Sequence, residues 1–200
     1  MLVVAIDGRW QLRSGRRPRT CRFSAPRSRM SRATLARRWA CDRVTPASPT
    51  IAPMRTFPEL VSIGYEGRDV DELIRQLGSL KVNVLVDVRL NPISRKRGMS
   101  KSALAISLQA AGIRYVHHRE LGNPKDNRDA YRSGDRTAYV RFEEILGLPE
   151  ATSAIKHVTE LLDGERVALL CFERDHDQCH RALVVEAIRQ LEPRVFVHQV

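Results

Sequence analysis

From residue 60 onward, short apolar runs alternate with segments in which apolar residues recur every three or four positions. A continuous apolar run is typical of a buried strand, and the three-to-four spacing is typical of a helix with one buried face. Alternation of the two indicates βαβ units. We therefore predict an α/β fold, a single three-layer Rossmann-like domain with a mainly parallel sheet, whose strands fall at 60–63, 84–88, 113–116, 166–172 and 195–197.

The helices of this domain are predicted from their spacing and their first residues. Asp69 and Ser100 are suitable caps for the helices that come after them. Cys179 opens the last predicted helix, and another helix covers about 151–162. The stretch 119–147 is more polar, with turn signals at Asn123-Pro124 and Ser133-Gly134. We expect two short helices on loops there.

Charge separates the first quarter of the chain from the rest. Residues 1–55 hold 13 of the 34 basic residues and two of the 23 acidic ones, so residues 56–200 carry 21 of each. The Arg-rich segment shows no sustained apolar period and is expected to be disordered. Three interpretations stay open: a targeting peptide, a disordered nucleic-acid-binding arm, or upstream sequence included by a mis-assigned start, which we favour because Met54 stands just before the first organised element. The domain is expected at 56–200.

Hydropathy and cysteine content indicate a cytoplasmic protein. No apolar run approaches the roughly 20 residues that a membrane span needs. Only Cys171 and Cys179 lie in the domain, too few for a secreted disulfide framework, so a reducing compartment is expected. Cys171, His176, Cys179 and His180 could suggest zinc. The two cysteines are eight residues apart and no second Cys pair is present, which does not match structural zinc sites, so we predict no metal. The sequence leaves any other cofactor undetermined.

Polar residues occupy the ends of four of the predicted strands. In parallel sheets, ligands bind beyond the carboxyl ends of the strands, where loops and helix starts converge. We therefore expect one site at this edge, with candidate residues of two kinds. The candidates for catalysis are Cys171, Cys179, Asp87, Glu66 and Glu173, and those for ligand binding are Tyr65, Arg89, Asn123, His180 and Arg181.

Several strings at these strand ends carry a family resemblance. They are SIGYEGR, VLVDVRLNPISRKRG, GIRYVHHRELGNP, AYRSGD and LLCFERDHDQCHR. In order and spacing they resemble the prokaryotic domain-of-unknown-function family 488, over about residues 60–198. The resemblance implies a cytosolic α/β domain and carries no activity with it.

Each candidate has a structural interpretation beside the functional one. Cys171 ends a buried strand and can be a core residue, whereas Cys179 beside His180 and Arg181 is placed to ionise, and the two cysteines can also pair as a reversible disulfide. Asp87 and Arg89 lie two apart and can form an ion pair.

The same residues can instead recognise and process an anion. In that interpretation Arg89 and Arg181 hold a phosphate, and Asp87, Glu66 or Glu173 acts as general acid or base. We predict an enzyme acting on a phosphate-bearing or otherwise anionic small molecule. The alternative is a nucleic-acid or regulatory-ligand binding module without catalysis. The neutral charge of the domain disfavours bulk affinity for nucleic acid unless charge is segregated on one face.

Overall fold

The computed structural model describes residues 57–200 and two short strands near the amino terminus, β1 (Ala5–Ile6) and β2 (Arg9–Trp10), which pair antiparallel. The chain divides into two units, Met1–Thr50 and Ile51–Val200. The predictions of disorder and of a mis-assigned start concern residues that, apart from these two strands, lie outside the described ones. The second unit holds the predicted α/β domain.

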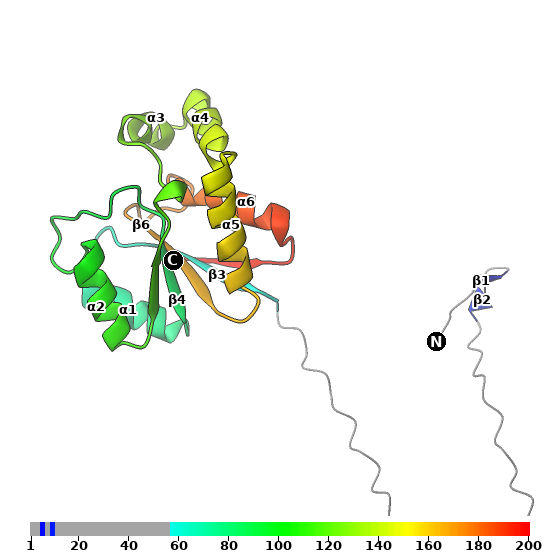
Figure 1. The fold of residues 1–200 in the computed structure, drawn as a ribbon, viewed down its shortest axis with the longest axis horizontal. Helices are drawn as coiled ribbons and strands as arrows, with labels where there is room; N and C mark the ends of the chain where they lie inside the picture. Colours follow the sequence, from blue (N-terminus) through cyan, green and yellow to red (C-terminus); the bar gives the residue numbers. More distant parts are fainter. Residues whose placement is uncertain (1–4, 7–8, 11–56) are drawn as a thin grey trace, which may run out of the picture. The chain divides into compact units, whose positions relative to one another are not determined.

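Five strands of the second unit form one sheet in which every pair is parallel (Figure 1). Their order across the sheet is β5-β4-β6-β3-β7. All five carboxyl ends therefore lie at one edge, as predicted from the strand-end pattern. The strands are β3 (Glu59–Gly64), β4 (Val84–Asp87), β5 (Arg114–His117), β6 (Val167–Cys171) and β7 (Phe196–Gln199).

Helices cover both faces of the sheet and enclose two separate cores. On one face, α1 (Val70–Ser79) and α2 (Lys101–Ala110) pack on the core that contains Ile63 and Leu85. The other face is covered by α4 (Arg136–Leu146), α5 (Pro149–Leu161) and α6 (Arg181–Leu191), as Figure 1 shows. The predicted three-layer α/β architecture is confirmed.

The predicted start of the first helix is confirmed, and the predicted start of the last helix is two residues too early. Asp69 caps α1 as expected, because its side chain accepts from Glu72 N at 2.8 Å while the Glu72 side chain accepts from Asp69 N. The last helix begins at Arg181 rather than at Cys179. Cys179 lies instead in the preceding turn, where its backbone N–H donates to His176 O at 3.1 Å.

The stretch 119–147 is more helical than predicted. It contains two 3₁₀ turns, η1 (Arg119–Leu121) and η2 (Lys125–Asn127), the short helix α3 (Arg128–Arg132), and the eleven-residue helix α4. Ala138, Phe142 and Leu146 recur every four residues and bury one face of α4, so packing on the sheet extends it beyond a short helix.

At strand β6 the chain connections change from one face of the sheet to the other. The helices that come after its two neighbours, β3 and β4, lie on the α1/α2 face, whereas the helix that comes after β6 lies on the opposite face. In open parallel sheets, a ligand crevice forms at such a switch point. No helix among residues 57–200 is long and apolar enough to cross a membrane.

Candidate functional site

Most of the predicted site residues form two clusters on opposite faces of the sheet. Asp87 pairs in register with Leu170, so Cys171 is one position further along its strand. Successive side chains of a strand point to opposite faces. Cys171 therefore belongs to the core under α6, and Asp87 lies on the face of α2 together with Leu85. The sequence prediction of one combined site divides accordingly.

The first cluster, called here the thiol cluster, consists of Cys171, Glu173, Cys179 and His180. Both sulfurs lie within hydrogen-bonding distance of the same carboxylate oxygen, Glu173 Oε2, at 3.0 Å from Cys171 Sγ and 3.3 Å from Cys179 Sγ. His180 Nδ1 lies 3.7 Å from the first sulfur and 3.8 Å from the second. Both cysteines and His180 are buried, whereas Glu173 is partly exposed. Cys171 is thus a core residue that also makes polar contacts.

The orientation of the His180 ring is fixed by its other nitrogen. His180 Nε2 lies 3.1 Å from the backbone oxygen of Val88, which can only accept, so Nε2 carries a proton. The Phe142 ring packs edge-on against the imidazole, with ring centroids 5.4 Å apart and planes at 87°. Nδ1 is therefore the nitrogen that faces the two sulfurs and can accept a proton or bind a metal.

Electrostatics separates the two thiols. Burial opposes ionisation of Cys179, but the hydrogen bond with Cys171 and the charges of His180 and Arg181 lower its pKa well below the ordinary value. Burial, followed by the interaction with Cys179 and the charge of Glu173, raises the pKa of Cys171. Burial alone would lower the pKa of His180, yet the Cys179 thiolate raises it. The arrangement favours one thiolate beside an imidazolium.

Two arginines add positive charge beside the thiol cluster. Arg181 is fully buried and donates from Nη2 to Glu173 O at 2.7 Å. Within residues 57–200, its Nε and Nη1 have no hydrogen-bond partner. Arg132 Nε lies 3.6 Å from Glu173 Oε1. One carboxylate oxygen of Glu173 therefore contacts the two sulfurs, and the other lies close to the guanidinium of Arg132.

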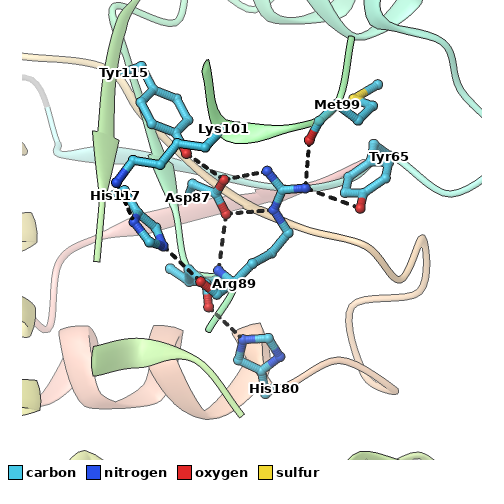
Figure 2. A network of polar contacts seen from close by, with 9 residues as sticks. Tyr65, Asp87, Arg89, Met99, Lys101, Tyr115, His117 and His180 are labelled. Atoms are coloured by element: carbon cyan, nitrogen blue, oxygen red, sulfur yellow. Dashed lines mark hydrogen bonds and ion pairs between the residues drawn. The ribbon is translucent and has the colours of Figure 1, made fainter. Parts of the chain in front are cut away.

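The second cluster is a buried ion pair between Asp87 and Arg89 (Figure 2). Arg89 donates from Nε to Asp87 Oδ1 at 2.8 Å and from Nη2 to Oδ2 at 2.5 Å, while Nη1 donates to Tyr65 Oη at 3.1 Å and Met99 O at 2.9 Å. Four of its five N–H groups are thus used inside the protein. This geometry favours the ion-pair interpretation over an anion-holding role for Arg89.

Sequence reasoning missed the members of this cluster that come from β5 and α2. Tyr115 Oη donates to Asp87 Oδ2 at 2.7 Å. His117 Nε2 lies 2.9 Å from Arg89 O, and its Nδ1 lies 3.1 Å from Lys101 Nζ, as Figure 2 shows. Tyr115 and His117 are two apart on the strand beside Asp87. Only the strand order, which the sequence does not give, places them there.

Three other residues considered from the sequence lie outside both clusters. Glu66 Oε2 accepts from the backbone N–H of Arg174 at 3.1 Å and so holds the loop after β6. Asn123 is buried, and its side-chain oxygen accepts from Asn127 Nδ2 at 2.9 Å. His176 Nδ1 bonds to the hydroxyl of Ser62 at 2.7 Å. These contacts tie loops to the sheet edge.

Comparison with known proteins identifies the family and nothing finer. The family model for the domain of unknown function DUF488 matches residues 69–188. No curated protein and no solved structure gives a significant match to the chain. The family match covers more than half of the chain, and it agrees with the resemblance of the strand-end strings. The chain therefore belongs to the DUF488 family.

Proposed function

We propose that this DUF488 protein is a small enzyme that acts on a phosphate-bearing or otherwise anionic small molecule, with the thiol cluster as its reactive centre. The observation that carries the proposal is the convergence of two thiols, an imidazole and a carboxylate at the end of β6. Burial of such groups costs free energy, and proteins concentrate them where chemistry requires them. Their place at the switch point is where open parallel sheets bind ligands.

Positive charge near the cluster supports an anionic substrate. The two unpaired donors of Arg181 leave a buried cation incompletely satisfied within the described residues. A pocket at the ends of β4 and β5 is lined by apolar residues and by three charged ones, Arg119, Glu120 and Glu150, of which Arg119 is the cation. It lies on the same face as the thiol cluster, because Ile145 and Ala151 of α4 and α5 line it. Arg119, which sequence reasoning missed, is suited to contact a phosphate there.

The thiol cluster supplies the groups that such a reaction needs. His180 Nδ1 is placed to hold the proton of Cys179 and leave a thiolate. Glu173 is the only partly exposed member of the cluster, so it is the group best placed to exchange protons with a substrate or with water. Asp87 and Arg89 are not reactants in this proposal, since they lie on the opposite face.

The test is a thermal-shift screen of the full chain against inorganic phosphate, nucleotides, sugar phosphates and short oligonucleotides. A ligand that binds the folded state raises the melting temperature by mass action. We expect a small anion to stabilise the protein, and Arg119→Ala to weaken that effect. Arg75→Ala is the matched control, because Arg75 is exposed on α1, at the opposite face of the sheet.

Turnover of the stabilising compound completes the test. We expect Cys179→Ser to abolish turnover while the variant remains folded by circular dichroism. Stabilisation by oligonucleotides alone would refute the enzyme hypothesis and favour the binding module. Binding and turnover that survive in Cys179→Ser would remove the thiol cluster from the reaction.

A further inference from the structure

The four side chains of the thiol cluster present ligand atoms of the kinds that bind zinc. Cys171 Sγ, Cys179 Sγ, a carboxylate oxygen of Glu173 and a ring nitrogen of His180 all lie within 4.8 Å of one another. We propose that these four residues bind a Zn²⁺ ion. This goes beyond the proposed enzyme, because it assigns the thiol cluster a metal ligand; a bound ion takes both sulfurs and His180 Nδ1, so the thiolate–imidazolium pair described above then belongs to the metal-free protein.

The sulfur-to-nitrogen distances of the thiol cluster agree with a tetrahedral site, and its sulfur-to-carboxylate distances are slightly shorter than such a site needs. Zn–S bonds of about 2.3 Å and Zn–N or Zn–O bonds of about 2.0–2.2 Å place neighbouring ligand atoms roughly 3.3–3.8 Å apart around a tetrahedron. The sulfur-to-nitrogen distances here are 3.7 and 3.8 Å, and the sulfur-to-Glu173 Oε2 distances are 3.0 and 3.3 Å. An ion at the centre would require Glu173 to move outward from the two sulfurs.

The surroundings of His180 are those of a metal-binding histidine. Such residues donate the second ring N–H to a backbone carbonyl or a carboxylate, which fixes the tautomer and aims the other nitrogen at the metal. His180 Nε2 meets the backbone oxygen of Val88 at 3.1 Å, and Nδ1 faces both sulfurs. Glu173 has an outer partner of its own in Arg132, at 3.6 Å from its other oxygen.

Ligand chemistry selects zinc among the common divalent ions. Two thiolates with one imidazole favour a borderline-soft ion in tetrahedral geometry, whereas Mg²⁺ and Ca²⁺ favour oxygen ligands. Two thiolates also compensate the charge of the ion, and Glu173 is balanced by the neighbouring arginines.

The spacing of the four ligands along the sequence does not match the usual pattern of a zinc site. Structural zinc sites usually contain two closely spaced Cys pairs, which this sequence lacks, and His176 of the same loop bonds to Ser62 instead. The fourth ligand is Glu173, two residues after Cys171, and the loop beyond it returns Cys179 and His180 to the same place. The expectation of no metal is therefore replaced by this proposal.

The experiment measures metal directly on the full chain. Zinc is removed with a chelator, and the apoprotein is titrated with Co²⁺, which reports tetrahedral thiolate ligation through visible d–d bands and a near-ultraviolet charge-transfer band. We expect one ion per chain. Cys179→Ser and His180→Gln should lower the affinity by more than the roughly 10–100-fold that outer-shell partners contribute. His176→Gln is the matched control, a histidine of the same loop whose substitution leaves the affinity unchanged.

The outcomes separate this proposal from the enzyme. Folded apoprotein that shows no thiolate-to-cobalt band, or Cys179→Ser protein that binds Co²⁺ with wild-type affinity and an undiminished band, would overturn the metal site even if small anions bind. If a variant fails to fold, the Co²⁺ titration of the wild-type apoprotein still tests whether the metal site exists, because it needs no substitution. Metal uptake with no anion binding and no turnover would retain the zinc site and reject the enzyme.

Discussion

The buried ion pair between Asp87 and Arg89 offers the sharpest test of the energetics, through the substitution Arg89→Met. Asp87 is 0% exposed, and the guanidinium supplies two of the hydrogen bonds to its carboxylate, at 2.8 and 2.5 Å. Methionine fills much of the same space but leaves the charge of Asp87 without a counter-ion. Removal of one partner from a buried ion pair costs about 3–5 kcal/mol. The total free energy of unfolding of a natural domain is about 5–15 kcal/mol, so this loss would be a large part of it.

The assay is urea unfolding of the full chain followed by circular dichroism. With a urea m-value of about 2 kcal/mol/M, a loss of about 3–5 kcal/mol lowers the midpoint by roughly 2 M while the slope stays unchanged. The double variant Asp87→Asn/Arg89→Met should recover part of this loss, because no charge is then left unpaired. A loss below about 1 kcal/mol, the range of an exposed ion pair, would refute the reasoning and return Arg89 to the candidates for anion binding.

Three further predictions concern other parts of the domain. Gly64→Ala should lower the melting temperature and abolish Co²⁺ uptake, because its Cβ would collide with the backbone oxygen of Glu173 and displace the loop that holds the thiol cluster. Burial and the charge of His157 lower the pKa of His118, so the unfolded chain binds more protons and stability should fall as the pH drops below about 6.5; His157→Gln should weaken that dependence in melts between about pH 5 and 7.5. Mass spectrometry should show that iodoacetamide modifies Cys179 faster after chelation than with Zn²⁺ bound.

Much of the fold could be predicted from periodicity, because burial on a sheet imposes the spacing of apolar residues. Examples are the strand predicted at 166–172, which is observed at 167–171, and the predicted cap at Asp69, which is observed. The helix over 136–146 was underestimated because its apolar positions recur among many polar residues. Strand order was not predictable, since parallel strands joined by helices need not be neighbours in the sheet.

The candidate site was predictable as a set of residues but not as an arrangement. Strand ends alone identify Asp87, Cys171 and their neighbours. Whether two such residues share a face depends on the register of their strands, and a shift by one residue reverses the answer. The observed pairing of Asp87 with Leu170 places Cys171 on the other face. That one-residue offset divides one predicted site into an ion pair and a thiol cluster.

The two clusters are nevertheless joined through the backbone at the end of β4. Val88 stands between Asp87 and Arg89, whose side chains are fixed on the α2 face, and its carbonyl oxygen accepts from His180 on the other face. The ion pair thus holds the carbonyl that sets the tautomer of His180 and leaves Nδ1 for the sulfurs. Arg89→Met keeps the Val88 carbonyl itself, so its effect should be smaller than the roughly 10–100-fold that loss of an outer-shell partner of a metal ligand costs in affinity. Arg89 is in this sense a positioning residue, and Arg89→Met should weaken Co²⁺ binding in the folded protein although it contacts none of the four proposed ligands.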